Sequence, residues 1–234
     1  MKTLSPLSND LAFALAFRTL QPAPPRPASL LVLLHGVGGS EANLAALGAE
    51  VDSRTLVVLP RGPITLGPTA FGWFRVTFTE AGPQIVASEA DASRRALIEF
   101  IAQLQQACGI DASHTVIAGF SQGGILSASV ALIAPERVAG FAVLAGRILP
   151  EIEPQLADAT RLSALRGYIA HGIHDDKLPV SWAQRSDDWL TRLGVAHQTK
   201  LYPTGHELAA PMRADFLAWL ARGEPRAGGV DPAG

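Results

Sequence analysis

Short apolar runs alternate with longer amphipathic segments over most of the chain. Continuous apolar runs bounded by turn residues are typical of strands buried on both faces of a sheet. Such runs predict strands over 29–35, 55–60, 114–120, 138–144, 167–171 and 195–202. The apolar segment 11–20 predicts one further strand, which ends at the proline-rich stretch 21–27.

Between these runs, apolar residues recur at spacings of three and four, the period of a helix. This pattern predicts helices over 41–51, 85–108, 122–133, 179–193 and 211–220. Strands that alternate with helices predict an α/β fold with a mostly parallel central sheet and helices on both faces. Residues 61–83 depart from the alternation, since many Gly and Pro residues with several aromatic ones predict a long ordered loop. We expect residues 1–222 to form a single domain and 223–234, rich in Gly and Pro, to be a mobile C-terminal tail.

Composition narrows the possible functions. Of 234 residues, 48% are hydrophobic and 17% charged, which provides for a large core and excludes disorder over most of the chain. The formal charge of −2 gives no electrostatic footprint for nucleic acid. No apolar run approaches the roughly 18 residues of a membrane-spanning helix, and the first one lacks the basic flank of a signal peptide. We therefore expect a soluble cytoplasmic protein without integral membrane association.

The strongest local signal is Gly119-Phe-Ser-Gln-Gly123, a G-x-S-x-G sequence between a predicted strand and a predicted helix. In that context the motif indicates a nucleophile elbow, a tight turn that exposes Ser121 and tolerates only glycine beside it. The alternative is an ordinary Gly-rich turn or a phosphate-binding loop. The dinucleotide and P-loop fingerprints are both absent, which favours the elbow.

A serine nucleophile needs a histidine base, which in this fold follows the acid in the chain. His206 comes after the last predicted strand and before the last predicted helix, so we expect it to be the base. His197 lies inside a predicted strand, so we expect it to be a packed or surface residue and not the base. His171 and His174 precede or abut the candidate acids, which reverses the expected order.

The acid should stand at the carboxyl end of the strand predicted over 167–171. Asp175 and Asp176 both qualify, and the pattern does not choose between them. The neighbouring His171 and His174 could suggest a metal site, but the spacing matches no known ligand set, so no metal and no cofactor is expected. The lone Cys108 likewise excludes a disulfide framework and a multi-thiolate metal site.

A second feature of such sites is a pair of backbone N–H groups that stabilise a developing oxyanion. Residues 35–39, His-Gly-Val-Gly-Gly, follow a buried strand, and their glycines would let the backbone approach a substrate. The N–H of Val37 and that of Gln122 are the expected donors. The alternative is a structural Gly-rich turn.

Six motifs in this order resemble the phospholipase/carboxylesterase family of α/β-hydrolases, which includes acyl-protein thioesterases and small bacterial carboxylesterases. The resemblance covers about residues 10–222 and is carried by Leu34-His-Gly-Val-Gly, Pro60-Arg-Gly-Pro, Gly72-Trp-Phe, Gly119-Phe-Ser-Gln-Gly-Gly124, His171-Gly-Ile-His-Asp175 with Leu178-Pro179, and Gly205-His206.

This resemblance implies an α/β-hydrolase fold with Ser121 as nucleophile and His206 as base. It implies Asp175 rather than Asp176 as the acid. It also implies that Val37 and Gln122 supply the oxyanion donors.

The resemblance further implies that Trp73 and Phe74 lie beside the substrate channel, although core packing is the more common role of aromatic residues in a loop. The chain departs from the family pattern where Gly39 takes the place of an aspartate, and where Arg147 replaces a residue that is often uncharged. Arg147 could bind an anionic group of the substrate. An ion pair at the surface is the commoner role of such a residue.

These observations predict a serine hydrolase that cleaves small-molecule carboxylic esters or thioesters of short to medium acyl chains. A lactonase related to dienelactone hydrolases shares the fold, but those relatives typically carry cysteine at the elbow, and Cys108 lies far from it in the chain. A non-catalytic binding scaffold would show a broken triad, whereas all three positions are filled here. A homodimer is left open by the composition.

Overall fold

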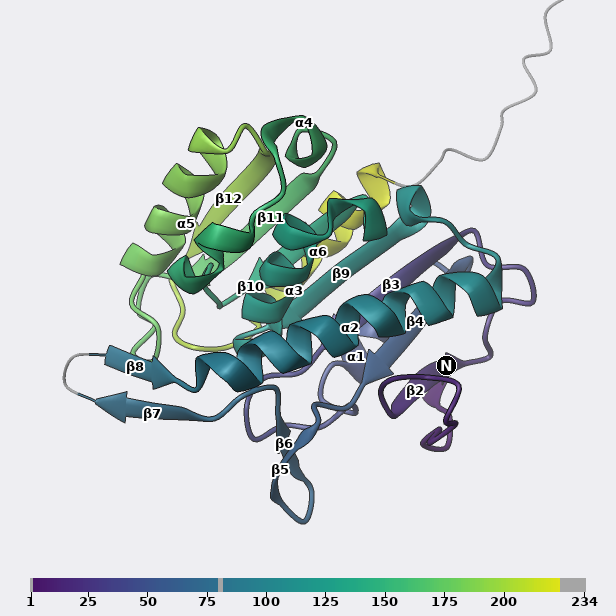
Figure 1. Cartoon of the computed structure of the whole chain (residues 1–234). Helices are drawn as coiled ribbons and strands as arrows, with labels where there is room; N and C mark the ends of the chain where they lie inside the picture. Colours follow the sequence, from purple (N-terminus) through teal and green to yellow (C-terminus); the bar gives the residue numbers. More distant parts are fainter. Residues whose placement is uncertain (1, 80–81, 224–234) are drawn as a thin grey trace, which may run out of the picture.

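An eight-stranded sheet runs through the centre of the protein, whose computed structural model describes residues 2–79 and 82–223 (Figure 1). Its strands follow one another in the order β1 (Thr3–Leu4), β2 (Phe17–Gln21), β4 (Thr55–Pro60), β3 (Ser29–Leu34), β9 (Thr115–Phe120), β10 (Gly140–Leu144), β11 (Arg166–Gly172) and β12 (Ala196–Tyr202). From β4 to β12 all neighbours pair in parallel, whereas β1 and β2 form an antiparallel edge. The mostly parallel sheet predicted from the alternation is confirmed.

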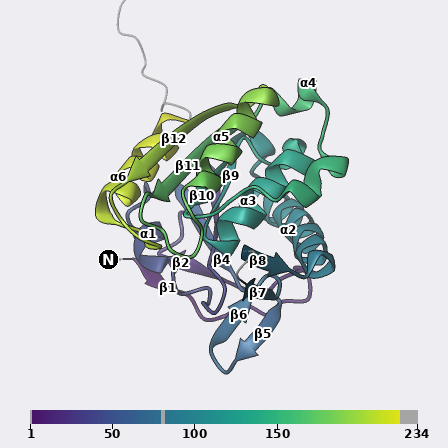
Figure 2. The ribbon, with the colours of Figure 1, turned by 90° about the vertical axis from the view of Figure 1, so that its left-hand side faces the viewer.

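Helices cover both faces of the sheet, as Figure 2 shows from the side. One face carries α2 (Ala87–Cys108), α3 (Gln122–Ile133) and α5 (Ser181–Arg192); the other carries α1 (Ala45–Ala49) and α6 (Ala210–Arg222). Each face buries its own apolar cluster, with Phe100 and Ile125 in one and Leu47 and Phe216 in the other. Every residue of β3, β4 and β10 is buried, which explains why these strands appear in the sequence as unbroken apolar runs. Minor elements are α4 (Ala159–Leu162) and 3-10 turns at Ala112–His114, Pro135–Arg137 and Pro150–Gln155.

The strand predicted over 11–20 is wrong for most of its length. Only Phe17–Gln21 is extended, and residues 11–15 form turns that begin where Asp10 accepts a hydrogen bond from the backbone N–H of Ala12 at 2.9 Å. Leu15 is buried without belonging to a strand, while Leu11 is fully exposed. Apolar side chains here reach the core from a turn, which the pattern alone does not distinguish from a strand.

The loop predicted over 61–83 is also wrong in most of its described part. It forms two antiparallel hairpins, β5 (Ile64–Gly67) with β6 (Ala70–Gly72), and β7 (Val76–Thr79) with β8 (Gly82–Ile85). Strands of three or four residues are too short to show a two-residue alternation, and the Gly and Pro residues between them hide it further.

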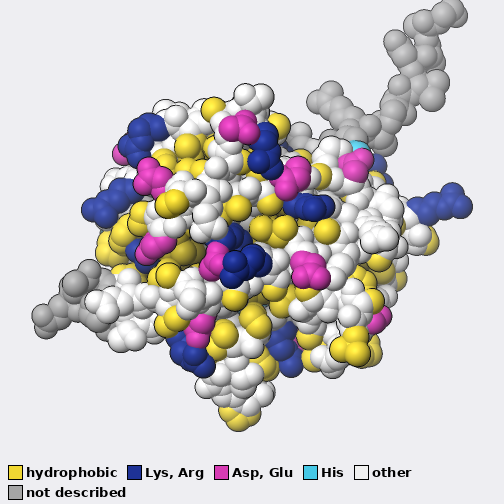
Figure 3. Space-filling model, in the orientation of Figure 1, with side chains coloured by type: hydrophobic (Ala, Val, Ile, Leu, Met, Phe, Trp, Pro, Cys, Tyr) yellow, Lys and Arg dark blue, Asp and Glu magenta, His cyan; other side chains and the backbone are white. Residues whose placement is uncertain are grey.

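Three further expectations concern membrane-spanning helices, the charge of the surface and the C-terminal tail. Among the residues described, no helix combines the length and the apolarity that crossing a membrane requires. Figure 3 shows Lys and Arg intermixed with Asp and Glu over the face that carries α2, α3 and α5. The tail predicted to be mobile falls, from residue 224 onward, outside the described residues.

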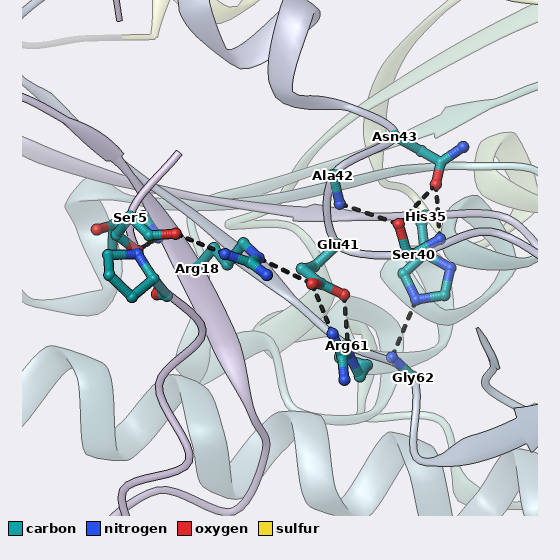
Figure 4. A network of polar contacts seen from close by, with 11 residues as sticks. Ser5, Arg18, His35, Ser40, Glu41, Ala42, Asn43, Arg61 and Gly62 are labelled. Atoms are coloured by element: carbon teal, nitrogen blue, oxygen red, sulfur yellow. Dashed lines mark hydrogen bonds and ion pairs between the residues drawn. The ribbon is translucent and has the colours of Figure 1, made fainter. Parts of the chain in front are cut away.

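A buried carboxylate holds the segment that follows β3. Glu41, 4% exposed, accepts hydrogen bonds from Arg61 at 2.7 and 2.8 Å and from Arg18 Nε at 2.9 Å (Figure 4). Arg18 also donates to the carbonyl of Ser5 at 2.8 Å. Next to this cluster, His35 Nε2 accepts a hydrogen bond from the N–H of Gly62 at 3.0 Å. Residues 35–41 are thereby tied to β2 and to the end of β4.

The two arginines stabilise the charged form of Glu41. The hydrogen bonds from Arg61, aided by Arg18, outweigh the cost of burial and lower the pKa of Glu41 from its usual 4.5 to about 2. A carboxyl whose pKa is lowered in the folded state stabilises the fold above its unfolded pKa and loses this contribution as the pH falls. The cluster therefore stabilises the fold at neutral pH and weakens between about pH 4.5 and pH 2.

We expect Glu41→Gln to lower the free energy of unfolding by about 3 kcal/mol at pH 7, the equivalent of the pKa difference. The difference from wild type should shrink steadily as the pH falls from 5 toward 2. Urea unfolding at several pH values measures it. Glu50→Gln, which removes an exposed carboxylate 3.8 Å from Arg213, is the control and should cost less than about 0.5 kcal/mol throughout. A pH-independent effect of Glu41→Gln would contradict the assignment.

Candidate active site

The turn from β9 into α3 places Ser121 in a strained backbone conformation. Its φ of 53° is rare for a residue with a side chain, and such strain is typical of functional sites. A Cβ on Gly119 would lie 2.3 Å from the carbonyl carbon of Gly123, and one on Gly123 would lie 2.2 Å from the carbonyl oxygen of Leu34. The chain can make this turn only because both residues flanking the elbow lack a side chain.

His206 lies in the loop between β12 and α6, beside the elbow. Its Nε2 is 3.0 Å from the Oγ of Ser121, and its Nδ1 is 2.7 Å from Oδ2 of Asp175. Because a carboxylate only accepts hydrogen bonds, Nδ1–H donates to Asp175 and leaves Nε2 free to accept the Ser121 proton. The ring also packs against Phe120, with centroids 5.0 Å apart.

Asp175 is held from its other side by backbone. Its Oδ1 accepts from the N–H of Lys177 at 2.9 Å and from that of Leu178 at 2.8 Å, and the residue is 6% exposed. The side chain of Asp176 is 74% exposed and pairs with Lys177 at 3.3 Å. The structure therefore brings Asp175, and not Asp176, to His206.

The remaining histidines after Ser121 have contacts of their own. His171 is fully buried and donates from Nε2 to the carbonyl of Leu178 at 2.7 Å, which steadies the loop that carries Asp175. His174 is exposed, and His197 contacts Asp187 at 3.2 Å from β12. In the part of the chain that the structure describes, no three His, Cys, Asp or Glu side chains gather as metal ligands.

Two backbone N–H groups beside Ser121 have no acceptor among the described residues. Gln122 is the first residue of α3, where a helix leaves its N–H groups without a partner. Val37 lies in the turn after β3, held in place because Gly38 donates to Phe71 at 2.8 Å and Phe71 donates to Gly39 at 2.8 Å. No acceptor among the described residues takes the N–H of Val37 or of Gln122. These are the two groups that the sequence suggested as oxyanion donors.

The side chain of Gln122 has a role that the sequence did not reveal. Its Oε1 accepts from the N–H of Trp73 at 2.7 Å, and its Nε2 donates to the carbonyl of Phe74 at 2.6 Å. Trp73 Nε1 donates to the carbonyl of His35 at 2.9 Å. His35 itself donates from Nδ1 to the carbonyl of Gly36 at 2.7 Å, and burial lowers its pKa, so it stays neutral. These contacts join 73–74 to both halves of the expected oxyanion site.

A cavity of about 290 Å³ opens beside Ser121 and His206. Its lining is mostly apolar and includes Val37, Phe74, Val76, Ile85, Ile125 and Leu178. The hairpin β7–β8, missed by the sequence analysis, supplies part of this wall.

Two sequence expectations about this cavity need correction. Phe74 lines it, but Trp73 does not: its side chain is fully buried with its ring 5.4 Å from that of His35, because the indole N–H bonds to the backbone there. Arg147 lines the cavity and is only 5% exposed, so the surface ion pair considered for it is wrong.

Cys108 lies at the end of α2, where burial raises the pKa of its thiol and makes it a poor nucleophile.

Comparisons with known proteins point to one family. The family model described as phospholipase/carboxylesterase matches residues 18–221. Acyl-protein thioesterase 1 of Emericella nidulans is 25% identical over 205 residues, which cover 76% of this chain and 82% of that protein. Esterase YpfH of Escherichia coli is 29% identical over 180 residues, which cover 74% of this chain and 73% of that protein.

Solved structures agree on the fold. The crystal structure of a carboxylesterase from Mesorhizobium loti superposes with a TM-score of 0.79 and 25% identity, covering 93% of this chain and 98% of that one. The mostly parallel sheet with helices on both faces is thus the α/β-hydrolase fold.

The two neighbouring aspartates give a matched test of the site. We expect Asp175→Asn to slow the labelling of Ser121 by a fluorophosphonate by at least about 100-fold, because an amide can hold the imidazole in the wrong tautomer. Asp176→Asn should change the rate by less than about threefold, since that side chain is solvated. The second-order rate of mass increase, measured on intact protein, reports both. Equal effects of the two substitutions would exclude Asp175 as the orienting acid.

Proposed function

The chain belongs to the phospholipase/carboxylesterase family and is a hydrolase, and on this premise we propose that it is a serine esterase with Ser121, His206 and Asp175 as its catalytic triad. The observation that carries the proposal is the chain of two hydrogen bonds, 3.0 and 2.7 Å long, that links these side chains beside an apolar cavity. Esters or thioesters are the substrates of this chemistry.

In the proposed reaction, His206 Nε2 takes the proton of Ser121 as Oγ attacks the acyl carbonyl carbon. The carbonyl oxygen becomes an oxyanion, which the N–H groups of Val37 and Gln122 stabilise. Each such donor contributes about 3 kcal/mol of transition-state stabilisation in measured oxyanion holes. Asp175 keeps the imidazole oriented and stabilises the imidazolium without taking its proton.

His206 then returns the proton to the leaving alcohol or thiol as the acyl–oxygen or acyl–sulfur bond breaks. The products of this half-reaction are the free leaving group and an acyl-enzyme on Ser121. Water deprotonated by His206 attacks the acyl-enzyme in the same way and releases the carboxylic acid. The cycle balances without a cofactor.

The size and the lining of the cavity support our proposal of short to medium acyl chains. Its volume of about 290 Å³ lies at the low end of the range of ligand pockets, and its apolar walls suit a hydrocarbon chain. Thioesterase and lysophospholipase activities use the same machinery and differ in the leaving group.

The two rivals have less support. A lactonase of the dienelactone-hydrolase type typically carries a cysteine at the elbow, where Ser121 stands here. In this chain the strained Ser121 is within hydrogen-bond distance of His206, and His206 is bonded to the buried Asp175. A protein that only binds a ligand has no need of this arrangement. The cytoplasmic location and a homodimer, both raised by the sequence, stay predictions.

We expect the wild type to hydrolyse p-nitrophenyl esters, with the highest kcat/KM between acetyl and octanoyl and a fall toward palmitoyl. Ser121→Ala should lower kcat by at least about 1000-fold, as removal of a triad nucleophile does in other serine hydrolases. Ser127→Ala serves as control, since Ser127 is buried in α3 and bonds only to the carbonyl of Gly123, at 2.9 Å. Ester turnover that survives in Ser121→Ala would refute the proposed mechanism.

A further inference from the structure

The backbone that follows β10 is built against the nucleophile elbow. Ala145 has a φ of 50° and, with Ser121, is one of two non-glycine residues at positive φ in the described part of the chain. A Cβ on the next residue, Gly146, would lie 2.9 Å from the carbonyl oxygen of Ser121. This second strained turn brings Arg147 to the cavity that Ser121 lines.

Arg147 is a buried cation to which no other described residue is hydrogen-bonded. The residue is 5% exposed, and its Nε is buried and unpaired. No hydrogen bond or ion pair joins Arg147 to any residue within 2–79 and 82–223. Its guanidinium lies over the ring of Trp182, 4.3 Å from the centroid. Stacking of this kind uses the flat face of the guanidinium and leaves the N–H groups at its edges available.

No carboxylate of the described lining neutralises the charge of Arg147. Lys177 is the other cation of the lining, and neither an Asp nor a Glu belongs to the lining within the residues described. Burial lowers the pKa of Arg147, and the negative charge of the exposed Glu151, outside the cavity, partly offsets that effect. The guanidinium stays protonated, as arginine does in proteins. A buried charge with no partner is unfavourable, so its presence next to the nucleophile needs an explanation.

We propose that Arg147 binds a negatively charged group of the substrate, so that the preferred ester carries a carboxylate or phosphate close to the ester bond. This inference rests on the proposed esterase function and specifies its substrate class. A guanidinium edge matches both oxyanions with two parallel N–H···O bonds, and the apolar walls hold the carbons between the anion and the reacting carbonyl. The anion can belong to the acyl group, as in a half-ester of a dicarboxylic acid, or to the leaving group, as in a glycerol phosphate ester.

A purely structural role for Arg147 is the competing explanation. In that case the guanidinium would serve only to pack on Trp182 of α5, and its replacement would affect all esters alike. Arg185 provides a matched control because it lies over the same ring, 4.9 Å from the centroid, but is exposed and does not line the cavity.

The test compares kcat/KM for charged and neutral esters of equal length. Monoethyl esters of dicarboxylic acids from succinate to suberate are set against ethyl esters of the corresponding monocarboxylic acids, and 1-butyrylglycerol 3-phosphate is set against 1-butyrylglycerol. For at least one pair, we expect the wild type to prefer the charged ester by about tenfold or more. A preference among the dicarboxylate half-esters places the anion on the acyl group. A preference for the glycerol phosphate ester places it on the leaving group.

Arg147→Met should lower the ratio of charged to neutral kcat/KM by about 10- to 100-fold, the loss expected for a charge-assisted hydrogen-bonded pair. Arg147→Lys should give an intermediate ratio, because it keeps the charge but not the fork of N–H groups. Arg185→Gln should leave the ratio as it is in the wild type. Near-UV circular dichroism checks the fold of each variant, and if Arg147→Met does not fold, the wild-type ratio and Arg147→Lys decide the outcome.

Binding separates this inference from the proposed function. In the Ser121→Ala background, calorimetry should detect tighter binding of monoethyl adipate than of diethyl adipate, and Arg147→Lys should weaken the difference. If no ester is hydrolysed but the charged ester still binds in this way, the esterase proposal fails and the anion site stands. If neutral esters are hydrolysed while charged ones are neither preferred nor affected by Arg147, the anion site is refuted and the esterase proposal stands.

Discussion

The backbone turn at Ser121 is the constraint on which the rest of the site depends. At φ 53° the chain leaves β9 and enters α3 within one residue, so that the serine Oγ stands clear of the sheet while the N–H of Gln122 stays free. This turn leaves no room for a Cβ at Gly119 or Gly123, where one would lie 2.3 and 2.2 Å from backbone atoms. The neighbouring strands β3 and β10 end at the same edge of the sheet, and their loops pack directly on the elbow.

Buried polar groups then fix the position of each loop. Glu41, between two arginines, holds the segment after β3, and Gln122 holds the segment at 73–74 through both ends of its amide. A buried polar group that is fully hydrogen-bonded specifies one arrangement, because every alternative would leave a donor or acceptor unpaired. The proposed oxyanion donors would therefore be positioned before any substrate arrives, which is the condition for electrostatic stabilisation of a transition state.

Arg147 differs from Glu41 and Gln122, because no hydrogen bond joins it to the other described residues. Asp175, the buried carboxylate beside Ser121, is by contrast bonded to His206 and to two backbone N–H groups. Its guanidinium follows a second strained turn and has no hydrogen-bond partner among the described residues. The proposed anion site requires such a cation, whose N–H groups stay available until the anion binds. The proposed substrate, with a hydrocarbon spacer and a charged end, fits the apolar lining of the cavity and the guanidinium of Arg147.

The sequence by itself determined the parallel strands of the sheet, the longer helices and the elbow, because these depend on local pattern: unbroken apolar runs for β3, β4 and β10, helical spacing for α2, and glycines on either side of Ser121. It left Asp175 and Asp176 undecided without the family resemblance, since adjacent residues of a turn differ only in direction. The tertiary structure decided matters that depend on contacts between distant segments: the hairpins of 64–85, the amide of Gln122 on 73–74, the withdrawal of Trp73 from the cavity and the burial of Arg147. The pattern of a chain records which face of an element is apolar, but it does not record which other segment will cover that face.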